Sequence, residues 1–191
     1  MKYTLDRSDT VTALNGATLY RIRYEDDTRG GYLQSTANLD PTGNARVSGN
    51  ARVSGDAWVS GNARVSGDAR VSGNARVSGD ARVSGNAWVY GDARVYGNAW
   101  VYGNAWVYGD ARVYGDAWVY GNAQVSGGAS ITWFSGVGSE IGTLTAFRAK
   151  AGIEVTRGCF HGTLDEFAAK VAERHGDSKI GAEYRLLIEF I

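Results

Sequence analysis

The sequence predicts a mainly β protein whose central part repeats one six-residue unit. From Gly43 to Ser126 the chain repeats Gly-(Asn/Asp)-Ala-(Arg/Trp)-Val-(Ser/Tyr) fourteen times with almost no drift. Within each unit Ala and Val are two residues apart, so they share one face of a short extended segment, whereas the Arg or Trp between them points the opposite way. Gly with Asn or Asp tolerates left-handed backbone angles, so the chain turns once per unit. We therefore expect small and β-branched side chains inside and large ones outside.

An up-and-down meander is the alternative arrangement for such a repeat. Its strands would be about three residues long, at the lower end of the usual range, and every second face would be left bare. A six-residue spacing also excludes the apolar stripe of an α-helix. We therefore favour a coil in which a corner follows each strand.

The repeat resembles the left-handed parallel β-helix family, in which a small residue and an aliphatic residue two positions later fill a three-sided coil. The resemblance covers residues 43–132, including a looser fifteenth unit at residues 127–132. It implies a left-handed parallel β-helix of about five triangular coils. The open ends of a solenoid need covers. We expect an N-terminal β-hairpin cap over residues 1–30, the β-helix over residues 31–132 and a small C-terminal α+β domain over residues 133–191.

The segment before the repeats predicts a hairpin that closes the N-terminal end of the coil. Asn15-Gly16 separates two β-prone runs, which is a strong short-range hairpin signal. The residues that follow resemble the lead-in of hexapeptide-repeat proteins from phages and gut bacteria. They are Gly30-Gly31-Tyr32-Leu33 and Asn38-Leu39.

The segment after the repeats predicts short strands and then two helices. Thr163-Leu164-Asp165-Glu166 is a capping box that begins a helix ending at His175. A second helix runs from Ile180 to about Ile191, with an apolar face of Leu186, Leu187 and Phe190. The whole segment resembles a tail domain that follows hexapeptide repeats in phage-encoded proteins, which implies a phage or prophage source.

Composition limits the partners of the protein. The 191 residues carry 20 basic and 20 acidic side chains, so generic nucleic-acid binding is not expected. No apolar stretch approaches the about 18 residues of a membrane span, and the first residues contain no apolar leader segment. The single Cys159 cannot form an intramolecular disulfide. We expect a cytoplasmic protein without membrane contact, in the host cytoplasm if it is phage-encoded.

Residues eighteen apart stack on one outer face if three units form one coil, at a spacing of about 4.8 Å. The first face carries Arg46, Arg64, Arg82, Trp100 and Trp118; the second face carries Arg52, Arg70, Trp88, Trp106 and Gln124; the third face carries Trp58, Arg76, Arg94, Arg112 and Ser130. Serine ends the early units and tyrosine ends most of the later ones, so the coil becomes aromatic towards its end.

We define the aromatic edge as the rings that collect on the first two faces and the corner between them: Trp88, Trp100, Trp106, Trp118, Tyr102 and Tyr120. A soluble monomer seldom exposes so large an apolar patch. Copies of the chain, its own C-terminal domain or a ligand are the possible covers. Proteins of the resembled family are commonly trimers, so we place a homotrimer first. The alternative without any partner is that the ladders only stabilise neighbouring strands.

The third face offers a candidate ligand site. We define the arginine row as Arg76, Arg94 and Arg112 with Tyr96 and Tyr114 beside them. Guanidinium forks and stacking rings suit phosphate and base recognition, as in a nucleotide-like ligand. A column of Asp56, Asp92 and Asp110 lies on a nearby corner, and we expect it to neutralise the arginines. The same arginines disfavour a metal ion there.

The histidine inventory argues against catalysis. The resembled family includes acyltransferases with a catalytic histidine and zinc-dependent carbonic anhydrases that need three, but this chain has only His161 and His175, both after the coil. Cys159 and His161 could share a face of an extended segment. We interpret them as a buried cysteine beside a surface histidine. No catalytic residue, metal or cofactor is expected.

These observations predict a non-catalytic structural or binding protein whose rigid shaft presents its C-terminal domain to a protein partner. One alternative is a protein that sequesters a small nucleotide signal of host defence. Another is a degenerate hexapeptide acyltransferase.

Overall fold

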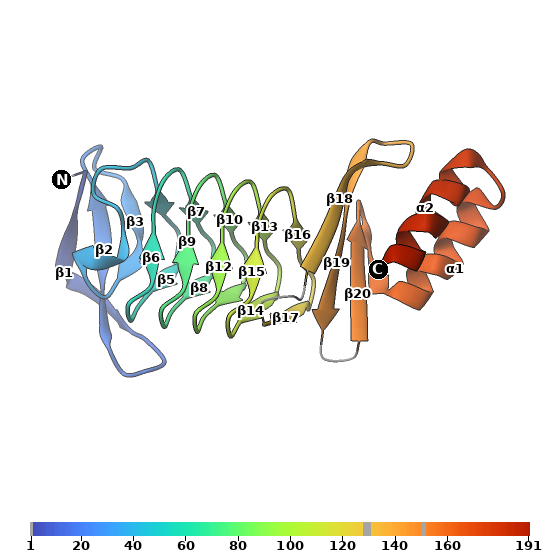
Figure 1. The fold of residues 1–191 in the computed structure, drawn as a ribbon. Helices are drawn as coiled ribbons and strands as arrows, with labels where there is room; N and C mark the ends of the chain where they lie inside the picture. The colour runs from blue at the N-terminus through green and yellow to red at the C-terminus, as the bar shows by residue number, and fades with distance from the viewer. Residues whose placement is uncertain (1, 128–130, 150–151) are drawn as a thin grey trace.

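The computed structural model describes residues 2–127, 131–149 and 152–191. Figure 1 shows a β-solenoid in the middle of the molecule, with the N-terminal strands at one end and a sheet and two helices at the other. Among the described residues, no helix is both long enough and apolar enough to cross a bilayer.

Each six-residue unit forms one short strand of the coil. The strands are β4 (Arg46–Val47), β5 (Arg52–Val53), β6 (Trp58–Val59), β7 (Arg64–Val65), β8 (Arg70–Val71), β9 (Arg76–Val77), β10 (Arg82–Val83), β11 (Trp88–Val89), β12 (Arg94–Val95), β13 (Trp100–Val101), β14 (Trp106–Tyr108), β15 (Arg112–Val113), β16 (Trp118–Val119) and β17 (Gln124–Ser126). Each strand from β4 to β14 pairs in parallel with the strand three units later, in the orders β5-β8-β11-β14-β17, β4-β7-β10-β13-β16 and β6-β9-β12-β15. The predicted stacking of residues eighteen apart is therefore confirmed, and the meander is excluded.

The interior is filled by one valine and one alanine from each unit. The fourteen coil valines from Val47 to Val125 are each 0 % exposed, and they form one continuous core with the alanines. Backbone bonds connect successive coils: Arg82 N–H donates to the Ala99 carbonyl and Ser84 N–H to the Val101 carbonyl, both at 2.9 Å. The chain is thus a β-solenoid of about five coils, as the repeat predicts.

Asparagine side chains connect the corners of successive coils. Asn62 Nδ2 donates to Asp80 Oδ1 at 3.0 Å, and Asn74 Nδ2 donates to Asp92 Oδ1 at 2.9 Å. Arg46 is the only coil arginine that forms an ion pair with another described residue, and its partner is Asp26 of the N-terminal region at 2.9 Å. The prediction that the Asp56, Asp92 and Asp110 column neutralises the arginine row was therefore wrong, because the neighbouring amide provides the bond that Asp92 accepts.

Three antiparallel strands precede the coil: β1 (Tyr3–Thr12), β2 (Thr18–Tyr24) and β3 (Arg29–Leu33). The hairpin predicted at Asn15-Gly16 is present, and Gly16 adopts a φ of 81° in its turn. β3 then pairs in parallel with β5, and Leu39 forms a bridge to Val59 after the short 3-10 helix η1 (Thr36–Asn38).

The chain after the coil forms an antiparallel sheet and two helices. The elements are β18 (Ile131–Val137), β19 (Gly142–Ala149), β20 (Gly152–Arg157), β21 (Phe160–Thr163), α1 (Leu164–His175) and α2 (Lys179–Phe190). The predicted capping box is present: Glu166 N–H donates to Thr163 Oγ1 at 3.2 Å, and Thr163 N–H donates to Glu166 Oε2 at 2.8 Å. A second apolar core joins this sheet to both helices, with Leu144, Val155, Phe167, Val171 and Tyr184 among its buried residues.

The fifteenth unit does not continue the coil as predicted. Ile131 is the first residue of β18 and pairs with Phe147 of β19 in an antiparallel register. The third-face position Ser130 lies outside the described residues. The physical reason is that β18 finds a longer antiparallel partner in β19 than one more two-residue coil strand would offer.

Two burial predictions for the C-terminal region were also wrong. Leu186 and Phe190 are 68 % and 73 % exposed, whereas Tyr184 is buried and Leu187 is half-buried. The stripe of α2 that packs consists of Ile180, Tyr184, Leu187 and Ile188, which repeat at helical spacing, and Ile191 at the end of the helix packs with them. Cys159 is exposed rather than buried, because it lies in the turn between β20 and β21.

Candidate functional site

The first two faces of the coil carry ladders that change from arginine to tryptophan. On the first face the Arg82 guanidinium carbon lies 4.7 Å from the Trp100 ring, and Trp100 stacks on Trp118 with centroids 5.3 Å apart. The second face repeats this order: Arg70 lies 4.8 Å from Trp88, and Trp88 stacks on Trp106 at 5.2 Å. The ladders form because the spacing of neighbouring strands matches the distance at which flat groups stack.

This order leaves the last tryptophan of each column most accessible. Trp88 and Trp100 are half-buried, since an arginine covers one side of each ring and a tryptophan the other. Among the described residues no arginine stacks over Trp106 or Trp118, and these two side chains are 38 % and 36 % exposed. The exposed part of the aromatic edge is therefore its C-terminal part.

Tyrosines stack along the corners in the same way. The ring centroids are 5.3 Å apart for Tyr90 and Tyr108, 5.2 Å for Tyr96 and Tyr114, and 4.9 Å for Tyr102 and Tyr120. Burial raises the pKa of Tyr90, and the neighbouring Tyr108 raises it further. The phenol of Tyr90 consequently keeps its proton near pH 7.

The C-terminal sheet contacts the end of the aromatic edge. The Tyr120 hydroxyl lies 2.7 Å from the Gly158 carbonyl and 2.6 Å from the Phe160 carbonyl. Burial, with a smaller contribution from Tyr102, raises the pKa of Tyr120 to about 12, so its hydroxyl keeps the proton that it donates. The backbone N–H of Trp118 also donates to Thr145 Oγ1 at 3.0 Å. One of the possible covers of the edge, the chain's own C-terminal part, is therefore in place at Tyr120.

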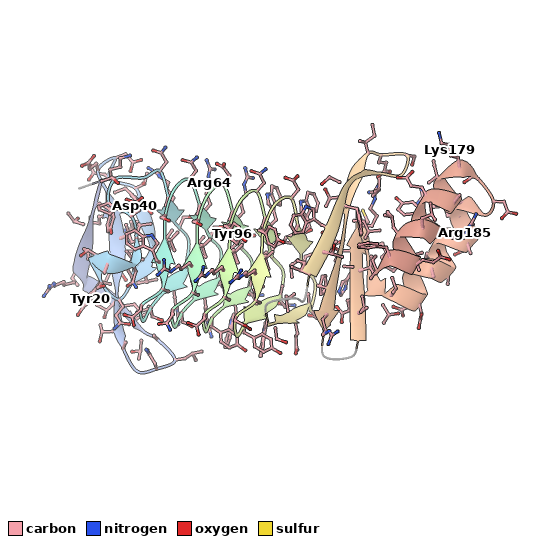
Figure 2. All side chains as sticks on the ribbon, viewed as in Figure 1. Tyr20, Asp40, Arg64, Tyr96, Lys179 and Arg185 are labelled. Atoms are coloured by element: carbon pink, nitrogen blue, oxygen red, sulfur yellow. The ribbon has the colours of Figure 1, made fainter. Side chains whose placement is uncertain are left out.

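The arginine row is a regular line of exposed cations. Arg76, Arg94 and Arg112 lie in register on β9, β12 and β15, and Figure 2 shows the row of nitrogen-bearing side chains along this sheet, near the labelled Tyr96. The rings of Tyr114 and Trp133 also pack nearly perpendicular to each other, with centroids 4.4 Å apart. The structure thus brings the predicted arginines and tyrosines onto neighbouring positions.

A hollow that the sequence pattern does not predict lies on the second face. It has a volume of about 460 Å³ and lies between the β1–β2 loop and the coil. Its lining residues are Ala13, Leu14, Asn15, Arg52, Ser54, Arg70, Val71, Ser72, Gly73, Trp88 and Tyr90. In Figure 1 the loop from β1 to β2 projects below the first coils. The change from serine to tyrosine along one corner was the only sequence signal for this hollow.

The residues considered for catalysis have structural contacts. His161 Nε2 lies 2.9 Å from Glu154 Oε2, and its ring lies 5.9 Å from that of Tyr120. Within the described part of the chain, no group of three or more His, Cys, Asp or Glu side chains could hold a metal ion.

Comparison with known families agrees with this geometry. The profile of the YdcK Beta solenoid repeat matches residues 45–61, 57–73, 63–79, 75–91, 88–103, 93–109, 105–121 and 111–127. The chain is a β-solenoid repeat protein. No curated protein matches it. In this β-solenoid repeat protein the matched segments cover the coil from β4 to β17 and leave the flanking parts unmatched.

Proposed function

We propose that this β-solenoid is a non-catalytic binding scaffold that assembles as a homotrimer through its aromatic edge. The observation that carries the proposal is the exposure of Trp106 and Trp118, which remain more than one third exposed after stacking. Aromatic side chains of this kind are enriched in protein interfaces, and closed symmetry is the usual form of self-association. Three parallel sheets support a triangular cross-section, and the resemblance to the β-helix family supports a left-handed coil.

The rigidity of the coil supports a scaffolding role. Backbone hydrogen bonds connect successive coils, and the alanine and valine side chains of the interior are buried. Such a shaft keeps the N-terminal hairpin and the C-terminal sheet and helices at a fixed separation. We propose that the C-terminal part binds a protein partner, and that the protein acts in the host cytoplasm as a phage-encoded factor, as the resemblance implies.

The chemistry of the two histidines supports the absence of catalysis. The coil contains no histidine, and His161 pairs with Glu154 rather than with a nucleophile. The ring of His175 lies 5.7 Å from that of Tyr184, against the second core. A general base would need access to a proton of a bound substrate.

Substitution of the exposed tryptophans tests the proposal. We expect Trp106→Ser/Trp118→Ser to dissociate the trimer, because the two rings would supply most of the apolar contact at the interface. Molar mass by light scattering provides the measurement, with circular dichroism as a check of folding. Trp58→Ser, on the third face at the other end of the coil, is the matched control and should leave the trimer intact. A folded double variant with an unchanged oligomeric mass would contradict the proposed interface.

A second candidate function is sequestration of a nucleotide-like anion along the arginine row. It is favoured by the lack of any ion pair from Arg76, Arg94 or Arg112 to an acidic side chain among the described residues. Guanidinium groups without carboxylate partners can accept a phosphate without first losing a bond. The Arg94→Gln variant used below separates this function from a site on the second face.

A further inference from the structure

We propose that the hollow between the β1–β2 loop and the second face binds a small organic anion with a flat apolar body. None of its lining residues is Trp106, Trp118 or a member of the arginine row. The site therefore shares Trp88 with the aromatic edge, but not the two exposed tryptophans that carry the proposed trimer interface, and it shares no residue with the second candidate function. Its volume of about 460 Å³ lies within the range of small-molecule sites, about 300–1,000 Å³.

The hollow arises from a change of side-chain size along one corner of the coil. Ser54 and Ser72 precede Tyr90 and Tyr108 at intervals of eighteen residues. The tyrosine rings fill the space beside the coil in the later rungs, whereas the small serines leave it open in the earlier ones. The β1–β2 loop then encloses this space, since Ala13, Leu14 and Asn15 line its outer side.

The charge of the hollow favours an anion. Arg52 and Arg70 line it, and its lining contains no acidic side chain. Both arginines are half-buried, whereas Arg64 and Arg82 of the first face and Arg94 of the third are exposed. Neither Arg52 nor Arg70 forms an ion pair with another described residue. Arg52 Nη1 lies 3.5 Å from the Thr12 carbonyl oxygen. Half-buried guanidinium groups bind carboxylates and phosphates more strongly than exposed ones do.

The remaining lining favours a flat apolar body next to the anionic group. Trp88 and Tyr90 meet edge to face with centroids 6.5 Å apart, and Arg70 lies over the Trp88 ring. Leu14, in the loop, is 76 % exposed although it lines the hollow. A bound ring would cover this leucine and stack beside the arginine and the tryptophan. The corresponding hollow of the first face, lined by Arg64, Ser66, Arg82, Ser84, Trp100 and Tyr102, measures about 300 Å³ and has no loop residue among its lining.

Calorimetric titration of the full chain with four probes tests the site. Naphthyl phosphate and naphthoate combine a flat ring with an anion, naphthol lacks the charge, and inorganic phosphate lacks the ring. We expect at least one of the two aryl anions to bind, and both naphthol and inorganic phosphate to bind at least about tenfold more weakly. Tighter binding of naphthyl phosphate would identify the anionic group of the ligand as a phosphate, and tighter binding of naphthoate would identify it as a carboxylate. Equal binding of naphthol, or no binding of either aryl anion, would overturn the proposal.

Filling the hollow locates the probe without disturbing the fold. Ser72→Tyr continues the tyrosine stack of Tyr90 and Tyr108, and we expect it to weaken binding at least about tenfold by occupying the space. Ser78→Tyr makes the same change at the third corner, next to Tyr96, and should leave affinity unchanged. Arg70→Gln should also weaken binding at least about tenfold, whereas Arg94→Gln should not. If the folded Ser72→Tyr variant bound the aryl anion with unchanged affinity, the proposed site would be wrong. If only the Arg94→Gln variant lost affinity, the anion would bind on the arginine row instead.

Discussion

Replacement of Val95 by Asp is expected to abolish folding of the coil. Val95 is 0 % exposed and lies on β12, between Val77 and Val113 of the neighbouring rungs. A carboxylate there would be surrounded by valine and alanine side chains, which can neither donate a hydrogen bond to it nor neutralise its charge. The expected loss of stability is at least about 4 kcal/mol, which exceeds what a single coil position can withstand in a marginally stable protein.

Arg94→Asp is the matched control for this substitution. Arg94 is the preceding residue, but its side chain points outward and is exposed between Arg76 and Arg112. The same carboxylate at this position should change stability by about 1 kcal/mol or less. Urea unfolding followed by circular dichroism measures both variants. Equal stabilities of the Val95→Asp and Arg94→Asp variants would contradict the assignment of inside and outside.

Replacement of Gly85 by Ala is expected to cost about 3 kcal/mol. Gly85 has a φ of 67°, and a Cβ there would lie 3.0 Å from both the backbone nitrogen and the carbonyl oxygen of Gly103 in the next rung. The substitution therefore combines a strained backbone conformation with a contact that the hydrogen-bonded coil cannot relax.

Gly16→Ala separates these two effects. Gly16 has a φ of 81°, but no atom lies within 4 Å of an added Cβ. Backbone strain alone should cost about 1 kcal/mol at this position. Thermal unfolding of both variants measures the difference, and a Gly16→Ala variant that loses as much stability as Gly85→Ala would show that stacking of the corners is not the source of the larger cost.

Sequence periodicity predicted the coil because every step of its folding is local. The alternation of Ala, Arg or Trp and Val assigns each side chain to the inside or the outside, and the constant interval of six aligns like residues in columns. The stacks of Trp88 on Trp106 and of Tyr96 on Tyr114 follow directly from this interval. Helix α1 was equally predictable, since its capping box lies within four residues of sequence.

The sequence-based predictions were wrong where contacts depend on distant parts of the chain. Ile131 leaves the coil because β19 provides it with a partner, and Leu186 and Phe190 lose their predicted burial because the sheet packs against a neighbouring stripe of α2. Charge alone suggested that Asp92 neutralises the arginines, but its carboxylate accepts a hydrogen bond from Asn74 one rung earlier. The hollow over Arg52 and Arg70 was missed because a loop about forty residues earlier in the sequence encloses it.

The candidate site residues were grouped correctly by column, but their accessibility was not predictable. Six aromatic residues define the edge in the sequence. The structure distinguishes Trp106 and Trp118, which remain accessible, from Tyr120, whose hydroxyl lies within hydrogen-bond distance of the Gly158 and Phe160 carbonyls. Accessibility depends on which neighbour covers each ring, and that neighbour belongs to another rung or another part of the chain.

The molar mass of the unmodified protein in solution tests the proposed function most directly. Light scattering across a range of concentrations should give three times the 20.4 kDa of one chain, because the exposed tryptophans need a cover that a single chain does not supply. A mass of one chain at every concentration would contradict self-association and would leave the aromatic edge to a different protein partner.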